Sequence, residues 1–216
     1  RDEVADLIGD VDDPMVRATV TSLDAMLALA SGSLADARRE ARSTAQHSAL
    51  NAPNFFLVAA RASVWLRDVD GARQDLAGLE ATGARGMAME IGRLVTHAAI
   101  AGLEGRTDEA LASFREGMKG WKSLGVTWDE ALTAIDMAVA LDPGLPEVEE
   151  AVERARAILE GVGAAPMLAR LDALAPRSAA AVTAASATTS AAAGGTGAGR
   201  ATTPQSPSER SVHVDA

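Results

Sequence analysis

The chain has 216 residues, a formal net charge of -10 and no cysteine. The length fits one domain of ordinary size with a tail, and apolar residues, which make up 48% of the chain, are enough for a core. The acidic balance disfavours phosphate backbones and anionic lipid as partners, while the missing cysteines exclude disulfides, thiolate nucleophiles and cysteine-based zinc sites. We therefore expect a cytoplasmic protein that binds neither nucleic acid nor membranes.

The first residues predict a lead-in followed by a helix. Residues 1–13 are polar and acidic, which is not the chemistry of a signal peptide, so we expect the end of a preceding helix or a linker in a longer protein. Asp13-Pro14 then predicts a helix start, because Asp caps well and Pro suits the first helical position. The apolar face of this helix, at helical spacing, consists of Val16, Val20, Leu23 and Leu27.

The same periodicity recurs in seven further helices, separated by short turns such as the one at Gly32. Thr127 with Glu130 matches a capping box, and residues 142–144 (Asp-Pro-Gly) predict a helix end. No segment alternates convincingly with period two, so we predict an all-α domain over residues 14–174. The apolar faces comprise, in order, Ala37, Ala41, Ala45; Phe55, Ala59, Ala62, Leu66; Ala72, Leu76, Leu79; Ile91, Val95, Ala98, Gly102; Leu111, Phe114, Met118, Trp121; Trp128, Leu132, Ile135, Val139; and Val148, Val152, Ala155, Leu159, Val162.

Residues 175–216 differ sharply in composition, since nearly all are Ala, Thr, Ser, Gly, Pro and Arg. Such a segment buries too little apolar surface to offset an ordering cost of about 1–2 kcal/mol per residue. We predict a disordered tail. The glycine-rich run 194–199 lacks the preceding strand and the Lys of a phosphate-binding loop, so it is interpreted as a flexible linker.

Small residues repeat at one position of successive helix pairs. Ala37, Ala72, Ala110 and Ala151 lie 35, 38 and 41 residues apart, and residues 105–117 place an aromatic four residues and a Gly seven residues after Ala110. This pattern resembles the second helix of the tetratricopeptide repeat, whose period is about 34 residues. The resemblance implies a right-handed α-solenoid of about four divergent helix pairs, in which small residues let helices cross closely.

A second resemblance covers residues 155–174, ARAILEGVGAAPMLARLDAL. The turn at 163–166 and the short helix after it look like the closing helices of large bacterial signalling proteins. In these proteins, an adenylate or guanylate cyclase or a helix-turn-helix regulator domain is coupled to an AAA-type ATPase and a tetratricopeptide-like region. The resemblance carries no catalytic residue, and it implies a regulatory C-terminal part of an ATPase-coupled signalling protein.

The sequence contains no recognisable catalytic, cofactor or metal site. His97 has Ile100 and Ala101 where a metal site on a helix needs a second ligand, so we expect a solvated or core-edge histidine. The carboxylates of residues 147–153 surround the first turns of a helix, where they stay solvated. Trp121 and Trp128 are assigned to the core, whereas Trp65 is compatible with either a core or a ligand box.

In tetratricopeptide folds the first helices line a concave groove, and the resemblance implies the same here. Carried over, it places Ser22, Met26, Asn54, Leu57, Arg61 and Trp65 in the groove, with Val95 and Ala99 in the next repeat. Two functions remain open: a non-catalytic scaffold that binds a protein or a neighbouring domain, and a sensor that binds a small inducer between repeats. We expect Arg61→Ala to weaken a partner with little loss of stability.

Overall fold

The computed structural model of the chain describes residues 14–174, with side chains placed from residue 23 onward, and these residues form nine α-helices and no strand. The expected all-α fold is thereby confirmed for this part, and the predicted lead-in 1–13 and tail 175–216 lie outside it. The helices are α2 (Pro14–Ser31), α3 (Leu34–His47), α4 (Ala52–Trp65), α5 (Val69–Ala81), α6 (Met87–Leu103), α7 (Thr107–Leu124), α8 (Thr127–Ala140), α9 (Pro146–Gly161) and α10 (Ala165–Leu174).

The helix ends follow local chemistry to within about a residue. Gly125 ends α7 with φ of 70°, a left-handed conformation that glycine adopts without strain. The capping box predicted at the start of α8 is wrong, because Thr127 is already the first helical residue. Its partner Glu130 is buried and bonds Arg154 of α9 instead. A tertiary ion pair has therefore replaced the local bond that the sequence suggested.

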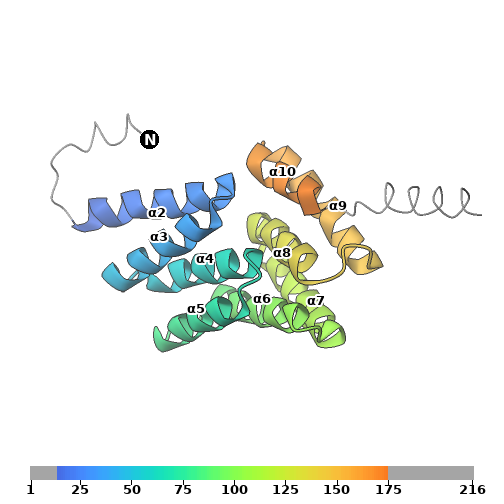
Figure 1. The fold of residues 1–216 in the computed structure, drawn as a ribbon, viewed down its shortest axis with the longest axis horizontal. Coiled ribbons are helices and arrows are strands. Elements are labelled where there is room, and N and C mark those ends of the chain that lie inside the picture. Colours follow the sequence, from blue (N-terminus) through green and yellow to red (C-terminus); the bar gives the residue numbers. More distant parts are fainter. Residues whose placement is uncertain (1–13, 175–216) are drawn as a thin grey trace, which may run out of the picture. The chain divides into compact units, whose positions relative to one another are not determined.

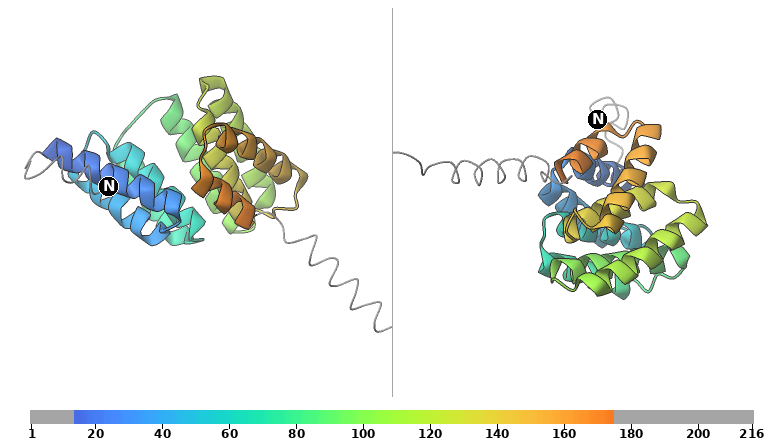
Figure 2. Two further views of the ribbon diagram at one scale, coloured as in Figure 1. Left: turned by 90° about the horizontal axis from the view of Figure 1, so that it is seen from above. Right: turned by 90° about the vertical axis from the view of Figure 1, so that its right-hand side faces the viewer.

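Successive helices lie side by side, and a second set of contacts joins every other helix (Figures 1 and 2). Helices α2, α4, α6, α8 and α10 contact one another in that order. In addition, α4 touches α8, and α2 touches α10. The even-numbered helices thus form one layer, here called the inner layer, and α3, α5, α7 and α9 each pack against two of them.

Small side chains make the close packing of these layers possible. Ala37, Ala72 and Ala110, at the repeat position of the second helices, are completely buried. Phe114 is also completely buried, so the large residue expected after Ala110 is confirmed as core. A Cβ added at Gly92 of α6 would lie only 2.8 Å from Leu57 Cδ1 of α4. An alanine at position 92 would therefore require the side chain of Leu57 to move.

The two described residues of the apolar stripe predicted on α2 are not on its buried face. Leu23 and Leu27 are 50% and 55% exposed, while Ala25 and Leu29 are buried. Ala25 packs in one cluster with small residues of α3, including Ala41. Close contact between two helices favours alanine over leucine at the interface, because the backbones can approach without a side chain between them. The periodicity identified the helix correctly but not the face that it buries.

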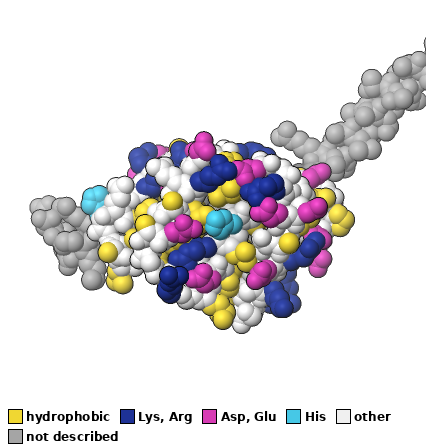
Figure 3. Space-filling model, turned by 90° about the horizontal axis from the view of Figure 1, so that it is seen from below, with side chains coloured by type: hydrophobic (Ala, Val, Ile, Leu, Met, Phe, Trp, Pro, Cys, Tyr) yellow, Lys and Arg dark blue, Asp and Glu magenta, His cyan; other side chains and the backbone are white. Residues whose placement is uncertain are grey.

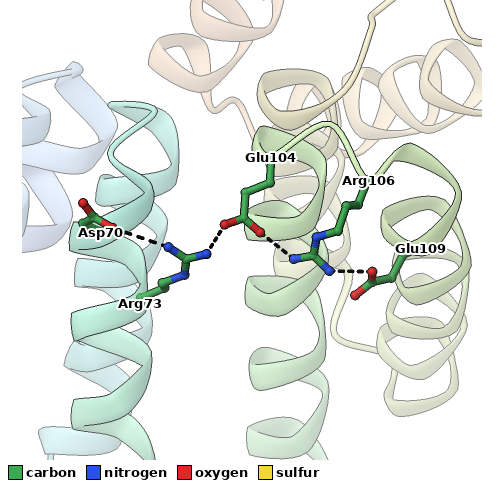
Figure 4. Close-up of polar contacts among 5 residues, drawn as sticks. All are labelled: Asp70, Arg73, Glu104, Arg106 and Glu109. Atoms are coloured by element: carbon green, nitrogen blue, oxygen red, sulfur yellow. Dashed lines mark hydrogen bonds and ion pairs between the residues drawn. The ribbon is translucent and has the colours of Figure 1, made fainter.

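Ion pairs join neighbouring helix pairs at the surface (Figure 4). Arg73 of α5 bonds Asp70 and reaches Glu104 at the end of α6. Arg106 then bonds both Glu104 and Glu109 of α7. The hydrogen bond from Arg106 is the main cause that lowers the pKa of Glu104. This chain of charges fixes the α6–α7 turn against α5.

On the face seen in Figure 3, acidic and basic side chains are interspersed, with single apolar side chains between them. A mixed surface of this kind is typical of a solvated face. Among the described helices, none combines the length and the apolarity that are needed to cross a membrane.

Candidate functional site

A cleft of about 570 Å³ lies among α2, α4, α8 and α10, and is here called the inner cleft. Helices α2 and α4 are far in sequence from α8 and α10. The contacts α4–α8 and α2–α10 bring the two pairs together. The volume falls within the range of about 300–1,000 Å³ typical of ligand sites. The cleft is lined by Leu23, Met26, Leu29, Ala30, Asn51, Asn54, Phe55, Leu57, Val58, Arg61, Trp128, Asp129, Leu132 and Met167.

The rim of the inner cleft is apolar and open to solvent. Leu23 and Met26 of α2 are about half exposed, and Trp128 at the start of α8 is 37% exposed. The assignment of Trp128 to the core is therefore wrong. Trp128 is the second residue of α8, so its side chain lies in the first turn of this helix. Large apolar side chains that remain in water around a cleft make it a candidate for a binding surface.

Beside the inner cleft, Asp136 of α8 anchors a buried polar cluster. Asp136 is 4% exposed and accepts a hydrogen bond from Trp65 Nε1 at 2.6 Å and one from Arg61 Nε at 3.0 Å. Burial raises the pKa of Asp136, and the bonds from Arg61 and Trp65 oppose this shift. The cluster ties α4 to α8 across 71–75 residues of sequence.

Arg170 of α10 closes the same cluster. Its guanidinium lies 4.3 Å from the ring centroid of Trp65, a cation–π contact. Its Nε atom is buried and has no hydrogen-bond partner in the described part of the chain. Burial lowers the pKa of Arg170, and the charge of Asp136 partly offsets this. Two arginines thus share the environment of one buried carboxylate.

The carboxylate of Asp129 also compensates the positive charge of Arg61, at the wall of the inner cleft. Asp129 Oδ1 lies 3.7 Å from Arg61 Nη1, and both residues line the inner cleft. Arg61 is therefore held between Asp129 at the cleft and Asp136 in the interior. Its side chain is only 12% exposed, so it does not project freely toward a ligand. The cleft offers a compensated charge pair within an otherwise apolar lining.

Four of the six predicted groove residues line the inner cleft: Met26, Asn54, Leu57 and Arg61. Trp65 does not, because its ring is buried between Asp136 and Arg170. Ser22 belongs to α2, but its side chain lies outside the described ones. Val95 and Ala99 line a separate cavity of about 30 Å³ that also borders Leu57 and Arg61.

Sequence reasoning missed the far wall of the inner cleft, which comes from α8 and α10. The signal it could have used is Asp136, a single charge in the middle of an apolar helix face. A carboxylate in such a position needs a buried partner. Arg61 and Trp65, four residues apart on α4, were both candidates for this partner. Nothing in the local pattern points to Trp128 or Met167.

The described residues contain no group of three or more His, Asp or Glu side chains that could hold a metal ion. His97 is 59% exposed and lies 3.9 Å from Glu80, which agrees with the prediction of a solvated histidine. The carboxylates of Glu147, Glu149, Glu150 and Glu153 are all exposed, as expected for the first turns of α9.

Comparison of the chain with protein-family models, with curated proteins and with solved structures finds no match.

Proposed function

We propose that the chain is a non-catalytic, tetratricopeptide-like interaction module that binds a segment of a partner protein, or of a neighbouring domain, in the inner cleft. The observation that carries this proposal is the exposed apolar rim of Leu23, Met26 and Trp128 around a cleft between helices of one layer. In this proposal the helix pairs form a right-handed solenoid in the cytoplasm and act as a regulatory scaffold.

The chemistry of the inner cleft specifies the kind of segment it binds. The lining is mostly apolar, and its Arg61 is compensated by Asp129 and Asp136. A strongly charged ligand would find no free counter-charge there. Asn51 and Asn54 supply amide groups that can hydrogen-bond a peptide backbone. The partner segment is therefore expected to present one or more large apolar side chains and few charges.

A peptide-display library panned against the full chain tests this proposal. Selected peptides are expected to be rich in large apolar residues and to lose binding to Met26→Glu, which puts a charge on the rim. Met87→Glu is the matched control, because Met87 is 62% exposed and does not line the cleft. Peptides that bind both variants equally well, or that lose binding to both, would contradict a role of the inner cleft.

A small-molecule sensor is the second candidate function. The inner cleft volume of about 570 Å³ matches that of a compact organic ligand, which favours this alternative. A thermal-shift screen of metabolites with the wild type and with Leu57→Trp, which fills the cleft, separates the two functions. A ligand that raises the melting temperature of the wild type alone supports the sensor. A screen without such a ligand removes this alternative.

The resemblance of residues 155–174 to the closing helices of signalling proteins supports a place in a larger regulatory protein. We propose that an ATPase domain, with a cyclase or a helix-turn-helix domain, belongs to the same polypeptide. Sequencing the gene upstream of the codon for Arg1 tests this. An upstream frame that encodes no such domain would refute it and would leave the inner cleft proposal untouched.

A further inference from the structure

A second cleft of about 540 Å³ lies among α7, α8 and α9, and is here called the outer cleft. It shares no lining residue with the inner cleft. Its floor is apolar and includes Phe114 and Met118 of α7 and Met137 of α8. Phe114 and Met137 are buried, whereas Met118 is half-buried and is the side chain that a ligand can reach.

The wall of the outer cleft formed by α7 is positively charged. Lys119 and Lys122 both line it and are both exposed, and they are the only lysines in the whole sequence. Among the described side chains, those of residues 23–174, neither lysine finds a partner for an ion pair or a side-chain hydrogen bond. At a spacing of three residues on one helix, the two ammonium groups face the same side.

Both arginines of the outer cleft are already paired. Arg115 bonds Glu147 at 2.7 Å, and Arg154 bonds the buried Glu130. The third lining carboxylate is that of Glu150, so four basic side chains line the cleft against three acidic ones. The cleft therefore carries a local excess of positive charge on a chain whose formal net charge is -10. This local excess of one positive charge favours the binding of an anionic group at the cleft.

We propose that the outer cleft binds an acidic peptide segment that carries a large apolar side chain. The apolar side chain lies on Met118 at the floor, and carboxylates beside it pair with Lys119 and Lys122. A nucleic acid is the less suitable anion, because the only aromatic ring in the floor, that of Phe114, is completely buried and offers no stacking face. This site is independent of the inner cleft and of its proposed partner.

The two lysines allow a direct measurement on the full chain. Reductive methylation with ¹³C-formaldehyde labels only Lys119, Lys122 and the terminal amine, and it keeps their charge. The probe is a synthetic peptide in which Asp and Glu flank one Leu and one Phe. We expect its titration to shift both lysine methyl signals while leaving the terminal amine signal in place, and added salt to weaken the effect.

Matched variants separate the outer cleft from general electrostatics. Lys122→Glu is expected to raise the Kd of the fluorescein-labelled peptide about three- to tenfold. Arg85→Glu changes the net charge equally at an exposed arginine outside the cleft, and is expected to leave the Kd unchanged. Met118→Ser is likewise expected to weaken binding, in contrast to Met87→Ser. Circular dichroism checks that every variant remains helical.

Four results would overturn the proposal. The first is that the lysine signals do not move when the acidic peptide is added to about 1 mM, a concentration at which all but very weak binding is detected. The second is an equal effect of Lys122→Glu and Arg85→Glu. The third is equal binding of a peptide whose Leu and Phe are replaced by Ser. The fourth is a single-stranded oligonucleotide that shifts both lysine signals as strongly as the peptide does.

Discussion

Replacing Arg61 by Ala tests the buried cluster that joins α4 to α8. The sequence alone suggested that this change would weaken a partner with little effect on stability. The geometry predicts otherwise, because Arg61 Nε donates to a carboxylate that is only 4% exposed. Without Arg61, Asp136 keeps the hydrogen bond from Trp65 but loses its only ion-pair partner among the described residues.

The size of the effect follows from leaving one charge buried. Removing one member of a buried ion pair costs about 3–5 kcal/mol, most of it the penalty of the stranded partner. In a domain of this size, 1 kcal/mol corresponds to about 2–4 °C in melting temperature. Arg61→Ala is therefore expected to lower the Tm by about 6–20 °C. Adding Asp136→Asn, which removes the stranded charge, is expected to restore a large part of this loss.

The pH dependence of the loss identifies its cause. Burial already raises the pKa of Asp136 in the folded chain, and removing Arg61 raises this pKa further. A carboxyl with a raised folded pKa favours the folded state when protonated, and this contribution disappears as pH rises through that pKa. The penalty of Arg61→Ala should thus be largest near pH 8 and should shrink as pH falls and Asp136 takes up a proton.

Thermal and urea unfolding of the wild type and the variants, followed by far-UV circular dichroism at pH 8 and at an acidic pH, measure these differences. Arg85→Ala is the control, since Arg85 is exposed and a surface change of this kind stays within about 0.5 kcal/mol. The reasoning would be refuted if Arg61→Ala cost no more than Arg85→Ala. A double variant no more stable than Arg61→Ala alone would also contradict it.

Three further predictions concern packing and charge elsewhere in the domain. Phe114→Ala removes a completely buried ring and should cost about 3–5 kcal/mol in urea unfolding, against a negligible effect of Leu50→Ala at an 83% exposed site. Gly92→Ala moves the flexible side chain of Leu57 aside but gains about 1 kcal/mol of helix propensity, so it should change stability by less than about 1 kcal/mol while weakening inner-cleft binding in the peptide assay. Asp68 accepts hydrogen bonds from the Gly71 N–H and from Arg38, and these bonds lower its pKa. The charge of Asp68 therefore stabilises the fold at neutral pH, and this contribution is lost as pH falls through the folded pKa. Because Asp68 is 41% exposed and Asn is an equally good cap, Asp68→Asn should cost below about 1 kcal/mol at neutral pH and nothing in acid.

Helical periodicity predicted the helices, and local chemistry predicted several of their ends. The left-handed Gly125, the break at residues 142–144 and Pro146 at the start of α9 depend on backbone preferences of one or two residues. Helical periodicity placed Ala37, Ala72 and Ala110 at a shared interior position, where they are completely buried. These features are visible in the sequence because the atoms that cause them lie within a few residues of one another.

Only the tertiary structure decided which apolar side chains are buried. Leu23, Leu27 and Trp128 look like core residues by periodicity, yet they lie at the surface, and Trp65 takes the buried position. The reason is that burial depends on what faces a helix. Alanines of α3 admit Ala25 rather than Leu23 or Leu27, and Trp65 meets Asp136 and Arg170 from helices distant in sequence.

The candidate site shows the same division. Resemblance to a repeat family placed Met26, Asn54, Leu57 and Arg61 on one surface, and all four line the inner cleft. The residues opposite them, among them Asp129, Leu132 and Met167, are separated from them by long stretches of chain. Periodicity along a helix fixes which residues share a face, but the packing of α4 on α8 and of α2 on α10 decides which faces meet across the cleft.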